Sequence, residues 1–145
     1  MKTSQTGADL IKAFEGCKLT AYKCSAGVNT IGFGNTYYPN GNKVKLGDKI
    51  TQEEANKLFL DLLPKYEKTV LDAIKVPLTQ NQFDALVSFC WNCGSSKTLF
   101  KMINEKHSEM NIVNWWISHY TKGGGKELPG LVRRRKAEAV LFVKK

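Results

Sequence analysis

A short segment that favours β-structure, residues 19–35, constrains the fold most, because helical patterns surround it on both sides. Its strand-forming residues are interrupted by three glycines, a pattern typical of a small antiparallel ribbon with tight turns. These residues are Tyr22, Val28, Thr30, Ile31 and Phe33, with Gly27, Gly32 and Gly34. Strands and helices therefore occupy separate parts of the chain, which predicts an α+β fold, mostly helical with a small N-terminal antiparallel β-lobe.

The helical patterns begin before this ribbon and continue after it. Apolar spacing predicts a helix over 4–15, which Gly16 ends, and later helices over 81–93, 95–105, 110–120 and 133–143. Thr51 and Glu54 form a capping-box pattern at the start of another helix, in which Pro64 is expected to cause a kink or a division. The triple glycine at 123–125 is expected to be a loop.

The length of 145 residues fits one domain. Within it we expect a β-containing lobe over about 15–60 and a helical lobe over about 65–145, with helix 1–14 packed on the helical lobe.

The charge of the chain favours an anionic partner. It has 22 Lys and Arg against 13 Asp and Glu, a net charge of +9, and such a charge attracts nucleic acid, anionic lipid head groups or cell-wall polymers alike. Outside the basic run at 133–136 the cations are scattered, which argues against a nucleic-acid-binding protein. The first residues lack a continuous apolar core, so we expect synthesis in the cytoplasm.

The pattern of Cys90 and Cys93 favours a role in core packing over zinc binding or redox chemistry. Cys90 and Cys93 form a C-x-x-C pair, but a zinc site needs four ligands and a redox pair normally begins a helix after a strand. We expect both cysteines, with Trp91 and Trp116, to pack in the core, and all four cysteines to be reduced. No metal or cofactor is implied.

Glu15 is the first candidate for chemistry because of its position at the end of the first helix. A carboxylate there meets the negative end of the helix dipole, and an apolar neighbour such as Phe14 adds desolvation. Both effects favour the protonated acid that a general acid must be. An exposed polar residue without a role is the alternative.

Three stretches of the sequence resemble the phage-type lysozymes, a family of glycoside hydrolases, and are most similar to its lambdoid endolysins. The first runs from Glu15 through Leu-Thr-Ala-Tyr at 19–22 and Gly-Val-Asn-Thr-Ile-Gly-Phe-Gly-Asn-Thr at 27–36; the others are 80–89 and 130–142. The resemblance implies a lysozyme-like fold with a catalytic cleft between lobes. It also implies a monomer that hydrolyses the β-1,4 bond between N-acetylmuramic acid and N-acetylglucosamine in peptidoglycan, with release through a holin. A wall-binding protein without turnover is the alternative function.

The family's catalytic spacing implies Glu15, Cys24 and Thr30 as the site, with cysteine in place of the usual aspartate. Glu15 would protonate the departing sugar oxygen. Cys24 and Thr30 would position water for inversion, or Cys24 would attack the sugar directly with retention.

The run Arg133 to Lys136 allows three interpretations: a solvated helix face, a patch for polyanions, or one arginine turned inward. The family pattern implies Arg134 as an ion-pair partner of Glu15, which would favour the ionised carboxylate. We expect the other basic residues of the run to be exposed.

Overall fold

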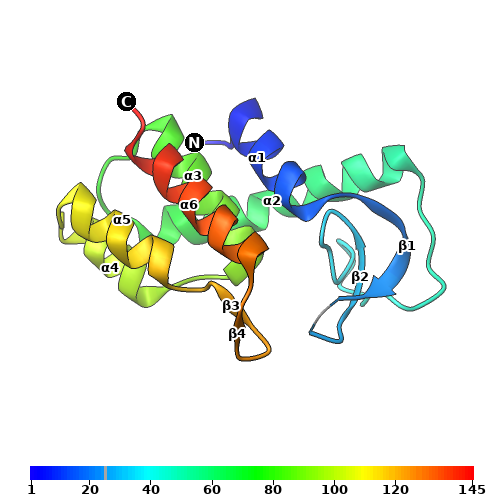
Figure 1. Ribbon diagram of the computed structural model, residues 1–145. Helices are drawn as coiled ribbons and strands as arrows, with labels where there is room; N and C mark the ends of the chain where they lie inside the picture. Colours follow the sequence, from blue (N-terminus) through cyan, green and yellow to red (C-terminus); the bar gives the residue numbers. More distant parts are fainter. Residues whose placement is uncertain (25) are drawn as a thin grey trace. The chain divides into compact units, whose positions relative to one another are not determined.

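The computed structural model describes residues 1–24 and 26–145. In this part of the chain six helices and two small antiparallel sheets follow in the order shown in Figure 1. The helices are α1 (Gln5–Glu15), α2 (Gln52–Ala73), α3 (Gln80–Cys93), α4 (Lys97–Asn104), α5 (Glu109–Ser118) and α6 (Pro129–Val143). The strands are β1 (Lys18–Lys23), β2 (Asn29–Gly32), β3 (Lys122–Gly123) and β4 (Lys126–Glu127). The predicted α+β class, mostly helical with a small N-terminal sheet, is confirmed.

The chain divides into two compact units. The first, here called the β unit, is Lys12–Pro64; the second, the helical unit, combines Met1–Ile11 with Lys65–Lys145. Helices α1 and α2 each begin in one unit and end in the other.

The β unit is built on the hairpin of β1 and β2. Tyr22 pairs with Thr30 in antiparallel register, and an irregularity between Lys18 and Tyr22 bends the first strand. Beneath the hairpin, the rings of Phe33 and Phe59 meet edge to face at 5.6 Å between centroids, and both side chains are buried. This contact fixes the loop after β2 on the first half of α2.

The capping box predicted at the start of α2 is confirmed. The Thr51 backbone N–H donates to Glu54 Oε1 at 3.0 Å, and the Glu54 backbone N–H donates to Thr51 Oγ1 at 3.1 Å. Helix α2 is not divided at Pro64, because it runs as one helix from Gln52 to Ala73. The carbonyl that loses its donor to Pro64 belongs to Leu60, whose side chain is 63% exposed, so water is available to that carbonyl.

Helix α3 forms the centre of the helical unit and packs against α6. All nine residues from 83 to 91 are buried, which explains why its sequence is apolar on every side. Trp91 and Trp116 are buried as predicted. Thr79 caps the helix through a reciprocal bond with Gln82, and the helix ends before Gly94.

The N-terminal residues are bound to the same unit by two carboxylates. Asp84, fully buried in α3, accepts the Ser4 backbone N–H at 3.0 Å and also contacts the Ser4 hydroxyl. Glu67 accepts both the backbone N–H of Thr3, at 2.6 Å, and its hydroxyl, at 2.7 Å. Gly7 permits this approach, since a β-carbon there would lie 2.8 Å from Asp84 Cβ.

The segment between α5 and α6 differs from the prediction. The triple glycine forms a hairpin rather than an irregular loop: β3 and β4 pair, with Gly124 and Gly125 in the left-handed turn between them. Helix α6 begins at Pro129, four residues earlier than predicted, because proline suits the first helical position.

Candidate active site

Glu15, the predicted general acid, is the last residue of α1 and is half-buried in the β unit. Its carboxylate lies against Gly34, on the loop that follows β2. A β-carbon built on Gly34 would lie 2.9 Å from Glu15 Cδ, closer than any real side chain allows. Gly34 also has a φ of +78°, which favours glycine. Two features therefore favour glycine at residue 34: its positive φ and the closeness of the Glu15 carboxylate.

A tight turn holds Gly34 in this position. The backbones of Ile31 and Asn35 exchange two hydrogen bonds of 2.9 Å, and the Asn35 side chain accepts the Phe33 N–H at 3.2 Å. Asn35 is 4% exposed, so water does not compete for this bond. The turn and the helix end together define where the carboxylate sits.

Cys24 and Thr30 lie together at the other end of the same hairpin. The backbone of Cys24 donates to the Val28 carbonyl at 3.0 Å, and the Thr30 hydroxyl donates to that same carbonyl at 2.9 Å. Thr30 is buried, whereas Cys24 is half-buried. The Val28 carbonyl thus accepts both the Cys24 backbone N–H and the Thr30 hydroxyl.

The surroundings of Cys24 favour its thiolate. Burial raises the pKa of the Cys24 thiol, but hydrogen bonds from the backbones of Val28, Ala26 and Cys24 and from the Thr30 side chain lower it. The lowering prevails, so the pKa lies below the usual value for cysteine. The lowered pKa raises the fraction of thiolate at a given pH, and the thiolate is the form that can act as a base or a nucleophile.

Tyr22 interacts electrostatically with both Glu15 and Cys24, and sequence reasoning did not single it out as a site residue. Burial raises the pKa of the Tyr22 hydroxyl, and the charges of Glu15 and Cys24 raise it further. The charges of both groups therefore act on the Tyr22 hydroxyl, and Tyr22 pairs with Thr30 across the hairpin. The only signal in the sequence is its place in the Leu-Thr-Ala-Tyr stretch at 19–22.

Arg134 lies in the interior of the helical unit, 3% exposed. Its Nε forms an ion pair with Glu138 Oε2 at 3.3 Å, and its Nη2 donates to the Ser88 carbonyl at 3.1 Å. Glu138 is fully buried and also accepts the Ser88 hydroxyl at 2.6 Å and the Trp116 indole N–H at 3.2 Å. The pairing of Arg134 with Glu15 stays a prediction.

The expectation that Arg135 is exposed was wrong. Arg135 is fully buried, with its Nε 2.9 Å from Glu138 Oε1 and its Nη2 donating to Asn92 Oδ1 at 2.8 Å. Residues 134, 135 and 138 share the face of α6 toward α3, and Glu138 offers an oxygen to each arginine. Arg133 and Lys136 are exposed, as expected.

Cys90 is fully buried, as predicted, whereas Cys93 is only partly buried and contacts the Arg135 guanidinium. Burial raises the pKa of Cys90 to about 12 and that of Cys93 to about 11, so both thiols are poor nucleophiles. Among the described residues, no group of three or more His, Cys, Asp or Glu side chains is placed to hold a metal ion.

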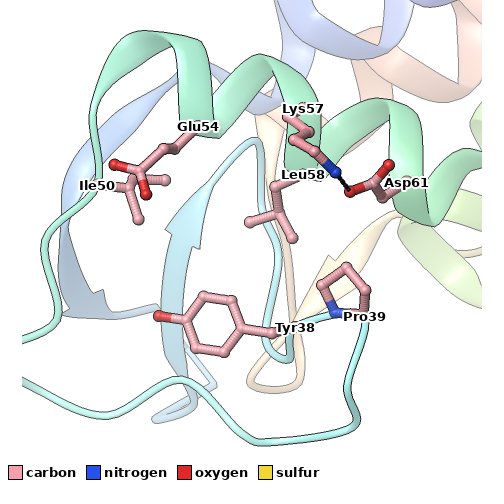
Figure 2. Close-up of a pocket in the computed structure, with 7 residues that line it drawn as sticks. All are labelled: Tyr38, Pro39, Ile50, Glu54, Lys57, Leu58 and Asp61. Carbon is pink, nitrogen blue, oxygen red and sulfur yellow. Dashed lines mark hydrogen bonds and ion pairs between the residues drawn. The ribbon is translucent and has the colours of Figure 1, made fainter.

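A pocket of about 200 Å³ lies in the β unit, and its lining includes none of the predicted site residues (Figure 2). Leu58 and Ile50 form its apolar part, and the ion pair of Lys57 with Asp61, 2.6 Å long, lies at one end. The Tyr38 ring forms another wall, and its hydroxyl donates to Asp48 Oδ2 at 2.7 Å. The polar groups of this pocket are thus largely paired within the protein.

Within residues 1–24 and 26–145, the structure contains no helix that combines the length and the apolarity needed to cross a membrane.

Comparisons with known proteins give a consistent result. Residues 12–138 match the family described as phage lysozyme. The endolysin of Acyrthosiphon pisum secondary endosymbiont phage 1 is 38% identical over 98% of this chain and 98% of its own length. Endolysins of Bacillus and Lactococcus phages are 38% to 41% identical over 98% to 99% of this chain, which spans 54% to 61% of their longer sequences.

Solved structures agree with these sequences. The endolysin from Escherichia coli O157:H7 phage FAHEc1 has a TM-score of 0.84 and 37% identity, covering 99% of this chain and 94% of that one. The muramidase domain of SpmX from Asticaccaulis excentricus has a TM-score of 0.81 and 31% identity, covering 99% of both chains. The predicted lysozyme-like fold is confirmed.

Proposed function

Because the chain belongs to the phage lysozyme family and has the function of a phage endolysin, we propose that it cleaves one particular bond of peptidoglycan. This is the β-1,4 glycosidic bond between N-acetylmuramic acid and N-acetylglucosamine. The observation that carries the proposal is the carboxylate of Glu15, held against Gly34 in the same unit as the Cys24 and Thr30 pair. The similarity to a muramidase domain supports the same bond.

Glu15 acts as the general acid. Glu15 is the last residue of α1, and its carboxyl lies against Gly34 in the β unit. The acid donates its proton to the glycosidic oxygen as the bond to the anomeric carbon breaks, so the departing sugar leaves as an alcohol. The turn at 31–35 fixes the carboxyl and so limits the motion that would misplace this proton.

Cys24 and Thr30 position the water that attacks the opposite face of the sugar. The thiolate accepts a proton from this water, and the Thr30 hydroxyl orients it, which gives inversion of the anomeric centre. The hydrogen bonds that lower the pKa of Cys24 favour the thiolate, which is the form that accepts this proton. The same bonds favour a second route, in which the Cys24 sulfur attacks the sugar and a covalent intermediate leads to retention.

Arg134 forms an ion pair with Glu15 in this proposal. Arg134 and Arg135 share the carboxylate of Glu138, so these three buried groups carry a net positive charge. Such a group attracts a further carboxylate. The pair would hold the Glu15 carboxyl in one orientation.

The positive charge of the chain supports attraction to anionic cell-wall polymers, and this attraction weakens as salt is added.

The enzyme resides in the host cytoplasm before lysis, reaches the wall after a holin permeabilises the membrane, and acts as a monomer.

Digestion of purified peptidoglycan tests the bond and the mechanism together. Muramidase activity yields new reducing ends on N-acetylmuramic acid, whereas an amidase yields free amino termini and a transglycosylase yields anhydro sugars. The anomeric configuration of fresh reducing ends, followed by NMR, then separates inversion from retention. Products without reducing N-acetylmuramic acid would contradict the proposed bond.

A further inference from the structure

The helical unit carries an uncompensated basic surface beside one of its pockets. It has 15 Lys and Arg against 8 Asp and Glu, a net charge of +7. Four exposed cations lie on the β3–β4 hairpin and on α6 as far as its middle: Lys122, Lys126, Arg133 and Lys136. Figure 1 shows the hairpin leading directly into α6. We call these four residues the basic edge.

The cations of the basic edge lack the ion pairs that several other exposed cations of the described residues form. Lys68 pairs with Asp72 at 2.5 Å, and Lys145 pairs with Glu109 at 2.6 Å. None of the four basic-edge residues forms an ion pair with any residue that the structure describes. Glu127 is the only acidic residue in the sequence from 110 to 137. The positive charge is therefore available to an external anion.

A pocket of about 340 Å³ opens within this surface, lined by Glu127, Pro129, Val132 and Arg133. The Arg133 guanidinium lies back over the first turn of α6, since a β-carbon on Gly130 would be 3.8 Å from Arg133 Nη2. The pocket thus combines a forked cation, a carboxylate acceptor and two small apolar surfaces. These groups suit a ligand with an anion, an N–H donor and a small apolar group.

We propose that this pocket binds the carboxyl-terminal D-alanine end of a peptidoglycan stem peptide. The terminal carboxylate pairs with Arg133, a peptide N–H donates to Glu127, and the alanine methyl groups contact Pro129 and Val132. A glycerol phosphate polymer fits less well, because it has no peptide N–H to donate to Glu127 and no methyl groups to contact Pro129 and Val132. The inference rests on the proposed function, because it assumes that peptidoglycan is the substrate.

Binding of a small peptide tests the site without catalysis. We expect N-acetyl-D-alanyl-D-alanine to shift the NMR signals of Glu127, Val132 and Arg133, and its C-terminal amide to bind at least about fivefold more weakly. Arg133→Ala should weaken binding by a similar factor. Lys136→Ala is the matched control, because it removes the same charge from the same exposed face of α6 without lining the pocket. Equal losses in both variants, or equal binding of acid and amide, would contradict the proposal.

Glu127→Gln distinguishes a stem peptide from a simple polyanion, because it should change their binding affinities in opposite directions. This variant makes the surface more positive, so it strengthens binding of any simple polyanion, poly(glycerol phosphate) included. It weakens binding of the dipeptide, because the amide is a poorer acceptor for the peptide N–H. Stronger dipeptide binding in Glu127→Gln would overturn the assignment to a stem peptide.

The inference and the proposed function fail in different experiments. If the dipeptide does not bind while peptidoglycan digestion yields reducing N-acetylmuramic acid, only the pocket assignment is wrong. If digestion yields other products while the dipeptide binds at Arg133, the pocket stands and the proposed bond is wrong.

Discussion

The carboxylate of Glu15 occupies the space that a side chain on residue 34 would fill, so the glycine at residue 34 lets this carboxylate lie against the loop after β2. The contact joins a helix end to a turn whose own hydrogen bonds fix its shape. Its consequence is that the position of the proposed general acid depends on a residue without a side chain.

Gly34→Ala should lower peptidoglycan hydrolysis by at least about tenfold, because the new methyl group displaces the Glu15 carboxylate and misplaces its proton. The backbone strain of a non-glycine residue at φ +78° also costs about 1 kcal/mol or more of folding stability. Gly41→Ala is the matched control, since it has a φ of +87° and open space around the new β-carbon. Equal activity losses in both variants would show that strain, not the carboxylate contact, is responsible.

The Cys24 thiol should react with iodoacetamide at a lower pH than a free cysteine, because its folded pKa is lowered. Thr30→Val should move this reactivity profile toward higher pH, since it removes one of the hydrogen bonds that lower the pKa. The measurement uses a protein with Cys17→Ser, and the raised pKa values of Cys90 and Cys93 keep those thiols unreactive at neutral pH. An unchanged profile in Thr30→Val would contradict the thiol–hydroxyl interaction.

The protein should lose stability above about pH 9, where its buried thiols begin to ionise in the unfolded chain. The folded pKa of Cys90, about 12, lies above its unfolded value of 9.0, so the stabilisation is complete below pH 9 and lost as pH rises toward 12. Each such thiol contributes at most about 1.4 kcal/mol per pH unit. Denaturant unfolding of Cys90→Ala should depend less steeply on pH between 9 and 11 than unfolding of the parent protein. Identical slopes would rule out Cys90 as a source.

Glu138→Gln should destabilise the helical unit by about 3–5 kcal/mol, because it leaves Arg134 and Arg135 buried without the carboxylate they share. The surface pair of Lys57 and Asp61 provides the comparison, and Asp61→Asn should cost less than about 1 kcal/mol. Chemical denaturation measures both. A cost below about 1 kcal/mol for Glu138→Gln would mean that the cluster is not held by charge.

Local patterns in the sequence predicted what local interactions determine. The capping box of Thr51 and Glu54 lies within four residues, and the apolar composition of residues 83–91 indicates burial on every side. The resemblance to phage lysozymes implied Glu15, Cys24 and Thr30 as one site, which stays a prediction, and the hairpin register places Cys24 near Thr30.

Features that depend on distant residues were not predictable in this way. The burial of Arg135 requires Glu138 and Asn92 as partners on two packed helices, and a run of four basic residues gives no sign of which one turns inward. The close approach at Gly34 depends on the carboxylate of Glu15, 19 positions earlier in the chain. The raised pKa of Tyr22 depends in part on the charges of Glu15 and Cys24, which its own sequence neighbourhood does not reveal. Pro64 is tolerated within α2 because the helix position that loses its hydrogen bond, Leu60, is exposed to solvent.

The reaction of Glu15→Gln with purified peptidoglycan tests the central claim most directly. Asp9→Asn, an exposed carboxylate on the same helix, is the matched control. The release of reducing ends should fall by at least about a hundredfold in Glu15→Gln, because an amide has no proton to give to the departing sugar oxygen, and should stay near the parent rate in Asp9→Asn. Release at the parent rate in a folded Glu15→Gln protein would show that this carboxyl group is not the acid.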